Sequence, residues 1–286
     1  MKTKKGLTLT MIFEASSLNY GEGLGNVTML KKVTKADGRT YTYVSRQALR
    51  YNIIENMGVD TTPVTAESGV VQFDPTAQID KYPEIDLFGY MKTQKESNGQ
   101  KRSAVVRLSN AESLMPFGQD MDFLNNMGLA NRCDAPNALA NSEIHNSMYA
   151  YTVVVDLDRV GIDGEIEITQ EEKANRICEL LDCIRYLSRD IKGRTESLNP
   201  IFGIGGIYDI KNPFFMGNVK VKKGNLNCDL LREIVRSSPY TKDKTYIAAL
   251  ADRFENAEEI NDLSNTSMSE LFVELKKEVK AYYESC

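Results

Sequence analysis

Alternating hydrophobic and polar positions define the first element of the chain. Between Gly6 and Phe13, the residues Leu7, Leu9 and Met11 alternate with threonines and an isoleucine. This two-residue period predicts a β-strand, because successive side chains of a strand point to opposite faces. Other hydrophobic runs of suitable length and composition predict strands at 103–108, 148–157, 201–210 and 214–221.

The longest predicted helix begins at a capping box. In Thr169-Gln-Glu-Glu172, the threonine and the last glutamate can satisfy backbone N–H groups at a helix start. Hydrophobic residues then recur at helical spacing as far as Ile191, and Gly193 can end the helix. The pattern therefore predicts one amphipathic helix that reaches Ile191.

Three further segments have helical signals. Residues 46–57 follow Ser45, a favourable N-cap, and precede Gly58, a favourable stop. The remaining predicted helices are a short one at 227–236 and a last one that starts at Ser267.

Two stretches without sustained periodicity, 59–101 and 110–147, interrupt these elements. When they are set aside, the order is strand, helix, strand, strand, helix, strand, which is typical of the ferredoxin-like fold and of RRM domains. We therefore predict an α+β protein whose ferredoxin-like (RRM-like) core comprises residues 1–58, 102–109 and 148–286.

The composition is that of an ordinary globular protein. The chain has 286 residues, of which 42% are hydrophobic and 26% charged, and this excludes wholesale disorder and collagen-like structure. No apolar stretch approaches the ~20 residues that span a membrane. The basic start resembles a signal peptide, but its apolar run contains threonines and precedes Glu14. We therefore expect a cytoplasmic protein.

Cysteine and histidine usage limits the possible chemistry. The five cysteines form no C-x-x-C pair, which suits a reducing compartment. His145 is the single histidine, so a multi-histidine metal site is excluded and histidine-based catalysis has one candidate. We expect no cofactor and no metal.

Charge is distributed unevenly along the chain. Residues 1–58 contain nine Lys or Arg and four acids, a net of +5, whereas residues 250–286 have a net of −5. The bases Lys211, Lys220, Lys222 and Lys223 form a second basic cluster. An acidic protein can therefore present a basic face to an anion.

The predicted helix start at Ser45 is the sharpest candidate site. A helix N-terminus presents free N–H groups and a positive dipole end, and both attract phosphate. Arg46 and Arg50 lie four residues apart, hence on one helix face, and Gln47 lies beside them. The basic segment 31–39 could form an opposite wall. The alternative is a solvated helix face, and this segment alone does not favour the phosphate site over it.

Several ordered blocks of the sequence resemble a known family. They read LTMIFEASSLNYGEGLGNV, TYVSRQALRYNI, DLFGYM, RSAVVRLSNAESLMPF and SMYAYTVVVDLDRVG. Together they resemble the backbone subunit of type I CRISPR Cascade complexes, specifically the DevR family of subtype I-B. The resemblance extends from about residue 6 to about residue 235, so the acidic C-terminal part carries little of it.

The resemblance implies a function and a domain organisation. Such subunits have a ferredoxin-like palm, a fingers insertion and a thumb insertion, which would correspond to residues 59–101 and 110–147. They are non-catalytic and oligomerise along a CRISPR guide RNA for antiviral defence. The implied partners are the guide RNA, target DNA through the guide, further copies of the chain and other Cascade subunits, with no membrane.

The resemblance also implies RNA-contacting residues. In the family, a Ser, a Gln and basic residues at the start of the first helix hold guide phosphates. The matching residues here are Ser45, Gln47 and Arg50, with Arg46 added. The other expected RNA contacts are Lys31, Lys32 and Arg39 in the basic segment, and Asn19 and Asn26 in the glycine-rich loop after the first strand.

The thumb-like stretch 110–147 is unusually apolar for a surface insertion. Phe117, Met121 and Leu124 have helical spacing and Gly128 could end a helix, so we expect a short docking helix. The alternative is a small hydrophobic core that packs on its own palm.

Other functions have weaker support. Asp156 and Asp158 alternate at a strand end and could hold Mg²⁺, which would make the chain a metal-dependent RNA-cleaving backbone subunit. We expect His145 to hydrogen-bond in a polar loop, because no nucleophile motif accompanies it. The G-x-G-x-G run after the first strand lacks the helix that a dinucleotide site requires. A transcriptional regulator lacks a helix-turn-helix pattern with a basic recognition helix.

Overall fold

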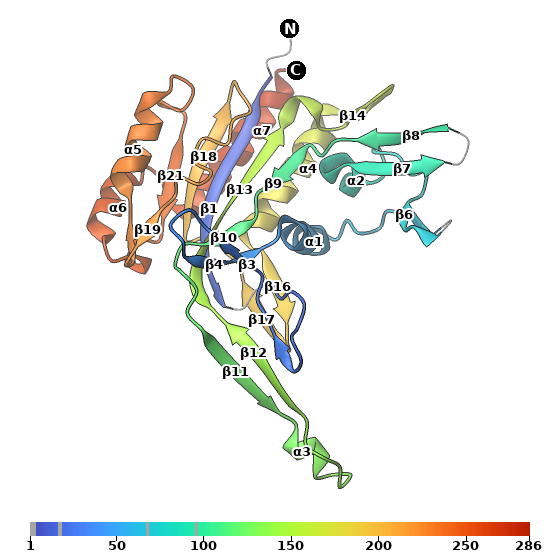
Figure 1. The fold of residues 1–286 in the computed structure, drawn as a ribbon. Coiled ribbons are helices and arrows are strands. Elements are labelled where there is room, and N and C mark those ends of the chain that lie inside the picture. Colours follow the sequence, from blue (N-terminus) through green and yellow to red (C-terminus); the bar gives the residue numbers. More distant parts are fainter. Residues whose placement is uncertain (1–3, 17–18, 67–68, 95–96) are drawn as a thin grey trace.

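The computed structural model describes residues 4–16, 19–66, 69–94 and 97–286, which are organised around one large antiparallel sheet (Figure 1). Its strand order is β21-β18-β1-β13-β10-β4-β3, and β9 also pairs with β13. The strands are β1 (Gly6–Ser16), β3 (Lys32–Thr34), β4 (Thr40–Val44), β9 (Val106–Leu108), β10 (Ala111–Ser113), β13 (Asn146–Asp156), β18 (Phe202–Tyr208) and β21 (Tyr246–Ala249).

The first strand lies in the middle of the sheet. β1 pairs with β13 along its whole length and with β18 on its other side. Leu9 lies opposite Val153 on one side and Gly205 on the other. A Cβ at Gly205 would lie 2.1 Å from the Thr8 carbonyl oxygen, so close backbone approach requires glycine at this position.

The sheet buries a hydrophobic core on each face. Leu9, Met11 and Phe13 join the core beneath helices α1 (Arg46–Met57), α4 (Gln170–Arg185) and α7 (Met268–Glu284). Ile12 points the other way, into a second core with residues of α5 (Cys228–Ser237) and α6 (Ala257–Leu263). The strand is thus buried on both faces, and its hydrophobic run reflects this central position.

The elements confirm the mixed α+β class. The chain order β1, α1, β9 with β10, β13, α4 and β18 reproduces the predicted succession of strands and helices. α1 begins after the N-cap Ser45 and ends at Gly58, which has φ 65°. α7 has the predicted capping box between Ser267 and Glu270. α5 starts after Asn227 as expected.

The prediction for the end of the long helix was wrong. α4 begins after Thr169 as predicted but ends at Arg185. The following residues form the hairpin of β16 (Ser188–Ile191) and β17 (Arg194–Ser197). Lys192 and Gly193 have φ of 48° and 75°, which is typical of a two-residue hairpin turn. Gly193 therefore reverses a strand and does not end a helix.

The strand predicted at 214–221 was also wrong. Most of this stretch is turn, and only Val221–Lys222 form a strand, β19, which pairs with β20 (Asn225–Leu226). The buried Phe215 belongs to the second core, so its hydrophobicity reflects burial in a turn and not a strand period. The ring of the adjacent Phe214 packs edge-on against Tyr208, 5.2 Å away.

Residues 59–66, 69–94 and 97–102 form a separate lobe beside α1 (Figure 1). The lobe contains β5 (Val64–Thr65), β6 (Gln72–Phe73), α2 (Pro83–Phe88), β7 (Tyr90–Gln94) and β8 (Ser97–Arg102). Ala77, Ile79 and Ile85 make a small core of their own. Nearby β14 (Ile162–Asp163) and β15 (Ile166–Glu167) form a two-stranded ribbon.

Residues 110–147 contribute β10 to the main sheet and then project as a long hairpin (Figure 1). Its strands are β11 (Asp120–Asn125) and β12 (Leu139–Ile144), and α3 (Met127–Ala130) lies at its tip. At its base, β12 pairs with β2 (Val27–Thr28). The predicted helix through Met121 and Leu124 was wrong, because those residues pair across the hairpin and Gly128 lies inside α3.

A buried ion cluster fastens the lobe to the body. Asp86 of α2 is fully buried, and its carboxylate contacts Arg102 at 2.6 Å and Arg176 of α4 at 2.9 Å. The Gly161 amide donates to both carboxylate oxygens, at 2.9 and 3.1 Å. Arg176 also donates to the Ile79 carbonyl at 2.8 Å. The charges are therefore both paired and hydrogen-bonded, as burial requires.

Replacing Asp86 with Ala should strongly destabilise the fold. Two buried guanidinium groups would lose their shared counter-charge, and breaking such a buried pair costs about 3–5 kcal/mol. Chemical denaturation would measure the change in the free energy of unfolding. Asp229→Ala is the control, because the Asp229 side chain is 95% exposed where it meets Arg232, and such pairs contribute about 1 kcal/mol or less. Equal effects in the two variants would contradict the proposed importance of the cluster.

Candidate nucleic-acid interface

The N-terminus of α1 is largely satisfied by this chain's own side chains. Ser45 is 8% exposed, and its hydroxyl accepts a 3.3 Å hydrogen bond from the Ala48 amide. The Ser45 amide donates to Asn19 Oδ1 and the Arg46 amide donates to Asn110 Oδ1, both at 2.9 Å. The amides of Ser45, Arg46 and Ala48 are therefore not free for phosphate, the predicted capping role of Ser45 is confirmed, and its RNA contact stays a prediction.

The side chains that follow Ser45 have different surroundings. Arg46 and Gln47 are exposed. Arg50 is half-buried, with its guanidinium 5.5 Å from the centre of the Phe88 ring. Burial lowers the pKa of Arg50, and the charge of Glu84 opposes that shift. Arg46 and Gln47 can therefore meet a ligand directly, whereas Arg50 also packs α1 against the lobe.

The lysines of the basic segment 31–39 also differ in their surroundings. Lys32 Nζ lies 2.6 Å from Glu143 Oε1 and 4.7 Å from the centre of the Phe117 ring. Glu143 also accepts from the Leu30 amide at 2.7 Å. Lys32 therefore ties β3 to the base of the projecting hairpin, and its charge is used inside the chain. Lys31 is only half-buried, and its amide donates to the Asn19 carbonyl at 2.8 Å.

The other predicted contacts are more dispersed. Arg39 is exposed at the β3–β4 turn, where its amide donates to Asp37 Oδ1 at 3.0 Å. Asn26 is exposed, and its carbonyl accepts from the Asn141 amide of β12 at 2.9 Å. The structure thus brings Asn19, Lys31 and Ser45 together, whereas Arg39 lies at the β3–β4 turn and Asn26 lies against β12.

The β16–β17 hairpin also adjoins this site, although the sequence pattern predicts a helix as far as Ile191. The Lys192 ammonium lies 4.0 Å from the centre of the Tyr20 ring, next to Asn19 in the chain. Arg194 donates to the Ser16 carbonyl at 3.0 Å, at the end of β1. The sequence signal for this hairpin is the pair Lys192-Gly193, because a glycine at this place can form a hairpin turn as well as end a helix.

The acids proposed as a metal site are engaged by cations. Asp156 is 3% exposed, and its carboxylate accepts hydrogen bonds from Nη1 and Nη2 of Arg107. Nη1 of Arg159 lies 3.3 Å from Oδ2 of the same carboxylate. Asp158 lies 2.5 Å from Lys211, which is 3.7 Å from Asp156. Burial alone would raise the pKa of Asp156, but hydrogen bonds from Arg107 and the charges of Arg107 and Lys211 lower it overall. Across the described residues, no three His, Cys, Asp or Glu side chains gather as metal ligands.

His145 is buried at the base of the projecting hairpin. Its Nδ1 lies 2.6 Å from the Thr42 hydroxyl, and its ring packs edge-on against Phe117 and Tyr149. Burial lowers its pKa, although a hydrogen bond with Pro116 and the charge of Asp120 oppose that shift. The expected hydrogen-bonding role is confirmed, but the surroundings are aromatic and buried, not a polar loop.

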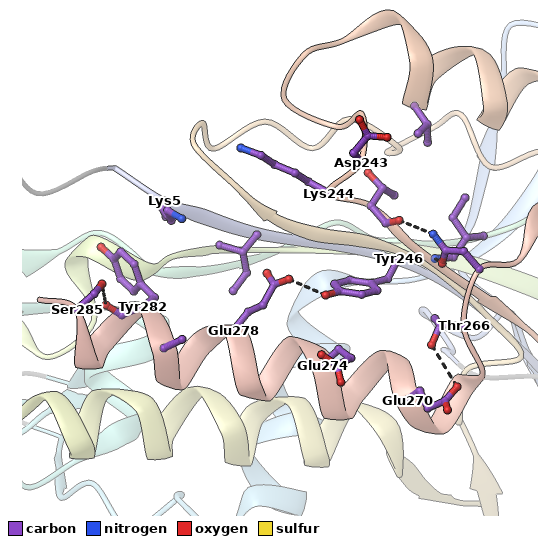
Figure 2. Close-up of a pocket in the computed structure, with 16 residues that line it drawn as sticks. Lys5, Asp243, Lys244, Tyr246, Thr266, Glu270, Glu274, Glu278, Tyr282 and Ser285 are labelled. Carbon is purple, nitrogen blue, oxygen red and sulfur yellow. Dashed lines mark hydrogen bonds between the residues drawn. The ribbon is translucent and has the colours of Figure 1, made fainter.

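A separate groove is lined in part by residues of the C-terminal region (Figure 2). It has a volume of about 1050 Å³ and runs between α7 and the edge strand β21. Glu270, Glu274 and Glu278 line it from α7, and Glu278 accepts a 2.7 Å hydrogen bond from Tyr246. Asp243 adds a fourth acid and Lys5 and Lys244 add two bases, so the lining is net negative and disfavours phosphate.

Comparison with known proteins identifies the family. Residues 7–224 match the family described as "CRISPR-associated negative auto-regulator DevR/Csa2". The chain belongs to the DevR/Csa2 family. No significant match is found among curated proteins.

Solved structures show a similar fold. One chain titled "CRISPR RNA-guided surveillance complex, pre-nicking" has a TM-score of 0.63 at 12% identity, over 96% of this chain and 100% of that one. Another, titled "CRISPR RNA-guided surveillance complex", has a TM-score of 0.59 at 14% identity, over 96% and 98% of the two chains. Both similarities include the acidic C-terminal part in the coverage, whereas the DevR/Csa2 match ends at residue 224.

In the part of the DevR/Csa2 chain that the structure describes, none of the helices combines the length and the apolar character that a bilayer crossing requires.

Changing Lys31 and Arg46 together to Ala should weaken RNA binding about equally for unrelated sequences. Each phosphate contact to a single strand contributes about 0.7 to the slope of log affinity against log salt, so the slope should fall by about 1.4. Filter binding at several salt concentrations would measure both quantities. Lys277→Ala with Lys280→Ala on α7 removes the same charge from the acidic region. If that control variant weakens binding as much, general charge and not this site would be responsible.

Proposed function

We propose that this chain is a non-catalytic guide-RNA-binding backbone subunit of a type I-B Cascade effector complex, which targets foreign DNA in antiviral defence. Family membership supports this role, as does a fold similar to chains of RNA-guided surveillance complexes. The observation that carries the proposal is the projecting β11–β12 hairpin, whose apolar tip is exposed on the isolated chain. The subunit would act in the cytoplasm with the guide, further copies of itself and other Cascade subunits.

The proposed RNA interface consists of phosphate and sugar contacts. Arg46, Gln47 and Lys31 lie where Asn19 and the capped start of α1 meet, with Arg50 behind them and Arg39 and Asn26 at the margins. Cationic and amide side chains bind a nucleic-acid backbone without reading bases. A subunit that accepts any guide sequence needs that property, because pairing between guide and target supplies the sequence specificity.

The proposed self-assembly uses the hairpin as a thumb and residues 59–101 as fingers. We define the tip patch as the exposed apolar residues of β11, α3 and β12, namely Met121, Phe123, Leu124, Met127, Leu129 and Leu139. The lobe carries a different exposed group, the lobe patch, which comprises Val64, Val70, Val71 and Met91. Two unlike patches favour head-to-tail association, which extends into a helical filament when it does not close into a ring.

The arrangement of Asp156 and Asp158 favours the non-catalytic role over metal-dependent RNA cleavage. A divalent cation would have to displace Arg107 and Lys211 from these carboxylates. Asp156 instead stabilises the end of β13, where its partners come from three separate segments of the chain.

Truncation of the tip tests the assembly role. Replacing residues 125–139 with Asn-Gly would join Leu124 to Ala140, a cross-strand pair, and retain the contacts of Glu143 at the hairpin base. The truncated protein should melt like the wild type, because the removed residues lie outside both main cores. When purified with a CRISPR array and the products of neighbouring genes, it should form shorter assemblies with less RNA.

Sizing chromatography and the ratio of absorbance at 260 and 280 nm would measure assembly length and RNA content. A matched control keeps the hairpin but replaces the exposed Arg132 at its tip with Ala, which leaves the tip patch intact. Assemblies of normal length in the truncated protein would exclude the thumb role, and wild-type protein that carries no RNA would exclude the proposed function.

The purified protein should not cleave RNA. Incubation with labelled RNA and Mg²⁺ or Mn²⁺ should leave the substrate intact, because both candidate carboxylates are neutralised by cations. The expected effect of Asp156→Ala is therefore on thermal stability, measured by the melting temperature. Cleavage that disappears in a folded Asp156→Ala or Asp158→Ala protein would establish the nuclease alternative.

A further inference from the structure

The tip of the β16–β17 hairpin holds a lysine in an unusual backbone conformation. Lys192 has φ 48° and Gly193 φ 75°, so both turn residues lie in the left-handed region. Turns of this type favour Asn or Asp before Gly, and a long side chain rarely adopts this φ. Because a lysine occupies this position, the turn presents a positive charge that Asn would not supply.

The contacts of Lys192 leave its charge available. The ammonium lies 4.0 Å from the centre of the Tyr20 ring and donates to the Ser142 hydroxyl of β12. Both partners are neutral. Lys192 is exposed, in contrast to Lys32, which is neutralised by Glu143. An ammonium held by a neutral ring and a neutral hydroxyl can bind a phosphate without breaking an ion pair to either of them.

Arg194 extends this positive surface along the hairpin. Its guanidinium donates to the Ser16 carbonyl at 3.0 Å and to the Ser16 hydroxyl at 3.1 Å, and the side chain remains 47% exposed. The neighbouring acid, Glu196, is 3.8 Å from Arg194 but is mostly buried and accepts from the Ser16 amide at 2.5 Å. The carboxylate of this ion pair is thus mostly buried, while nearly half of the Arg194 side chain is exposed.

The hairpin adjoins the proposed RNA interface through two consecutive residues. The Lys192 ammonium lies over the ring of Tyr20. The next residue, Gly21, lies beside Lys31, because a Cβ at Gly21 would be 3.6 Å from the Lys31 side chain. The residue before them, Asn19, holds the start of α1. Lys31 and Lys192 therefore flank the same short loop segment.

We propose that the β16–β17 hairpin is a second cationic wall of the RNA interface, in which Lys192 and Arg194 contact phosphates of single-stranded RNA. This inference rests on the proposed function, because it extends the surface that starts at Arg46. Lys192 is the principal contact, since its position at the turn lets it leave Ser142 for a phosphate without moving the strands. A purely structural tether between the hairpin and β12 is the alternative role.

Salt-dependent binding to unrelated single-stranded RNAs of equal length tests the proposal. Lys192→Ala with Arg194→Ala should weaken binding at least several-fold for every sequence and lower the salt slope by about 1.4, or about 0.7 per lost contact. Lys192→Arg retains the positive charge and should restore most of the affinity that Lys192→Ala alone removes.

Two further variants separate RNA contact from structure. Ser142→Ala removes the internal partner of Lys192 but keeps its charge, so RNA affinity should be unchanged or higher. Lys222→Ala with Lys223→Ala removes two charges from the β19–β20 hairpin, where Lys223 occupies an equivalent turn position with φ 49°. That hairpin packs on the second core, on the other face of the sheet, and its loss of charge should leave the salt slope unchanged.

The outcomes distinguish this inference from the proposed function. If the wild type binds RNA and the Lys192 and Arg194 variant keeps both its affinity and its salt slope, the hairpin inference is refuted and the proposed function stands. A loss of affinity in Ser142→Ala as large as that in Lys192→Ala would establish the tether instead. Wild-type protein that binds no RNA would refute both.

Discussion

The buried carboxylate of Asp86 is the interaction on which the arrangement of this protein depends. Two guanidinium groups from distant segments, Arg102 and Arg176, share it within the interior, and a backbone amide completes its hydrogen bonds. Because an unpaired charge at this depth is strongly unfavourable, α2, β8 and α4 are held together as one unit. Phe88 at the end of α2 then supports Arg50, so the buried cluster also fixes the lobe against the helix that begins at the proposed interface.

Cations serve two purposes in this chain, and burial separates them. Lys32 and Arg107 are matched to acidic side chains and stabilise the junctions between segments. Arg46 and Lys192 project from a helix start and a hairpin turn, where the surroundings are exposed. The net charge of −5 obscures this division, because residues 250–286 have a net charge of −5 and residues 1–58 have a net charge of +5. An anionic polymer would therefore be attracted to one surface and repelled from another.

Local sequence signals predicted the elements whose cause is local. The alternation in β1, the caps at Ser45, Thr169 and Ser267, and the composition of β13 each depend on neighbouring residues, and the structure confirms them. The errors occur where distant residues decide. Gly193 acts as a turn because the hairpin packs beside β1, and the residues from Met121 to Leu124 are extended because β12 pairs with them.

The same reasoning explains which site residues could be recognised from the sequence. Ser45 and the arginines of α1 were visible because a helix start has a local pattern. The role of Lys32 was not visible, since its partner Glu143 is 111 residues away. Lys192 was missed for the same reason, because its neighbours Tyr20 and Ser142 meet it only in the folded chain. A surface assembled from four segments leaves no contiguous motif, and in the proposed role this suits a protein that grips a backbone of any sequence. The residues needed for that task must share a charge and a surface, but they need not share a stretch of chain.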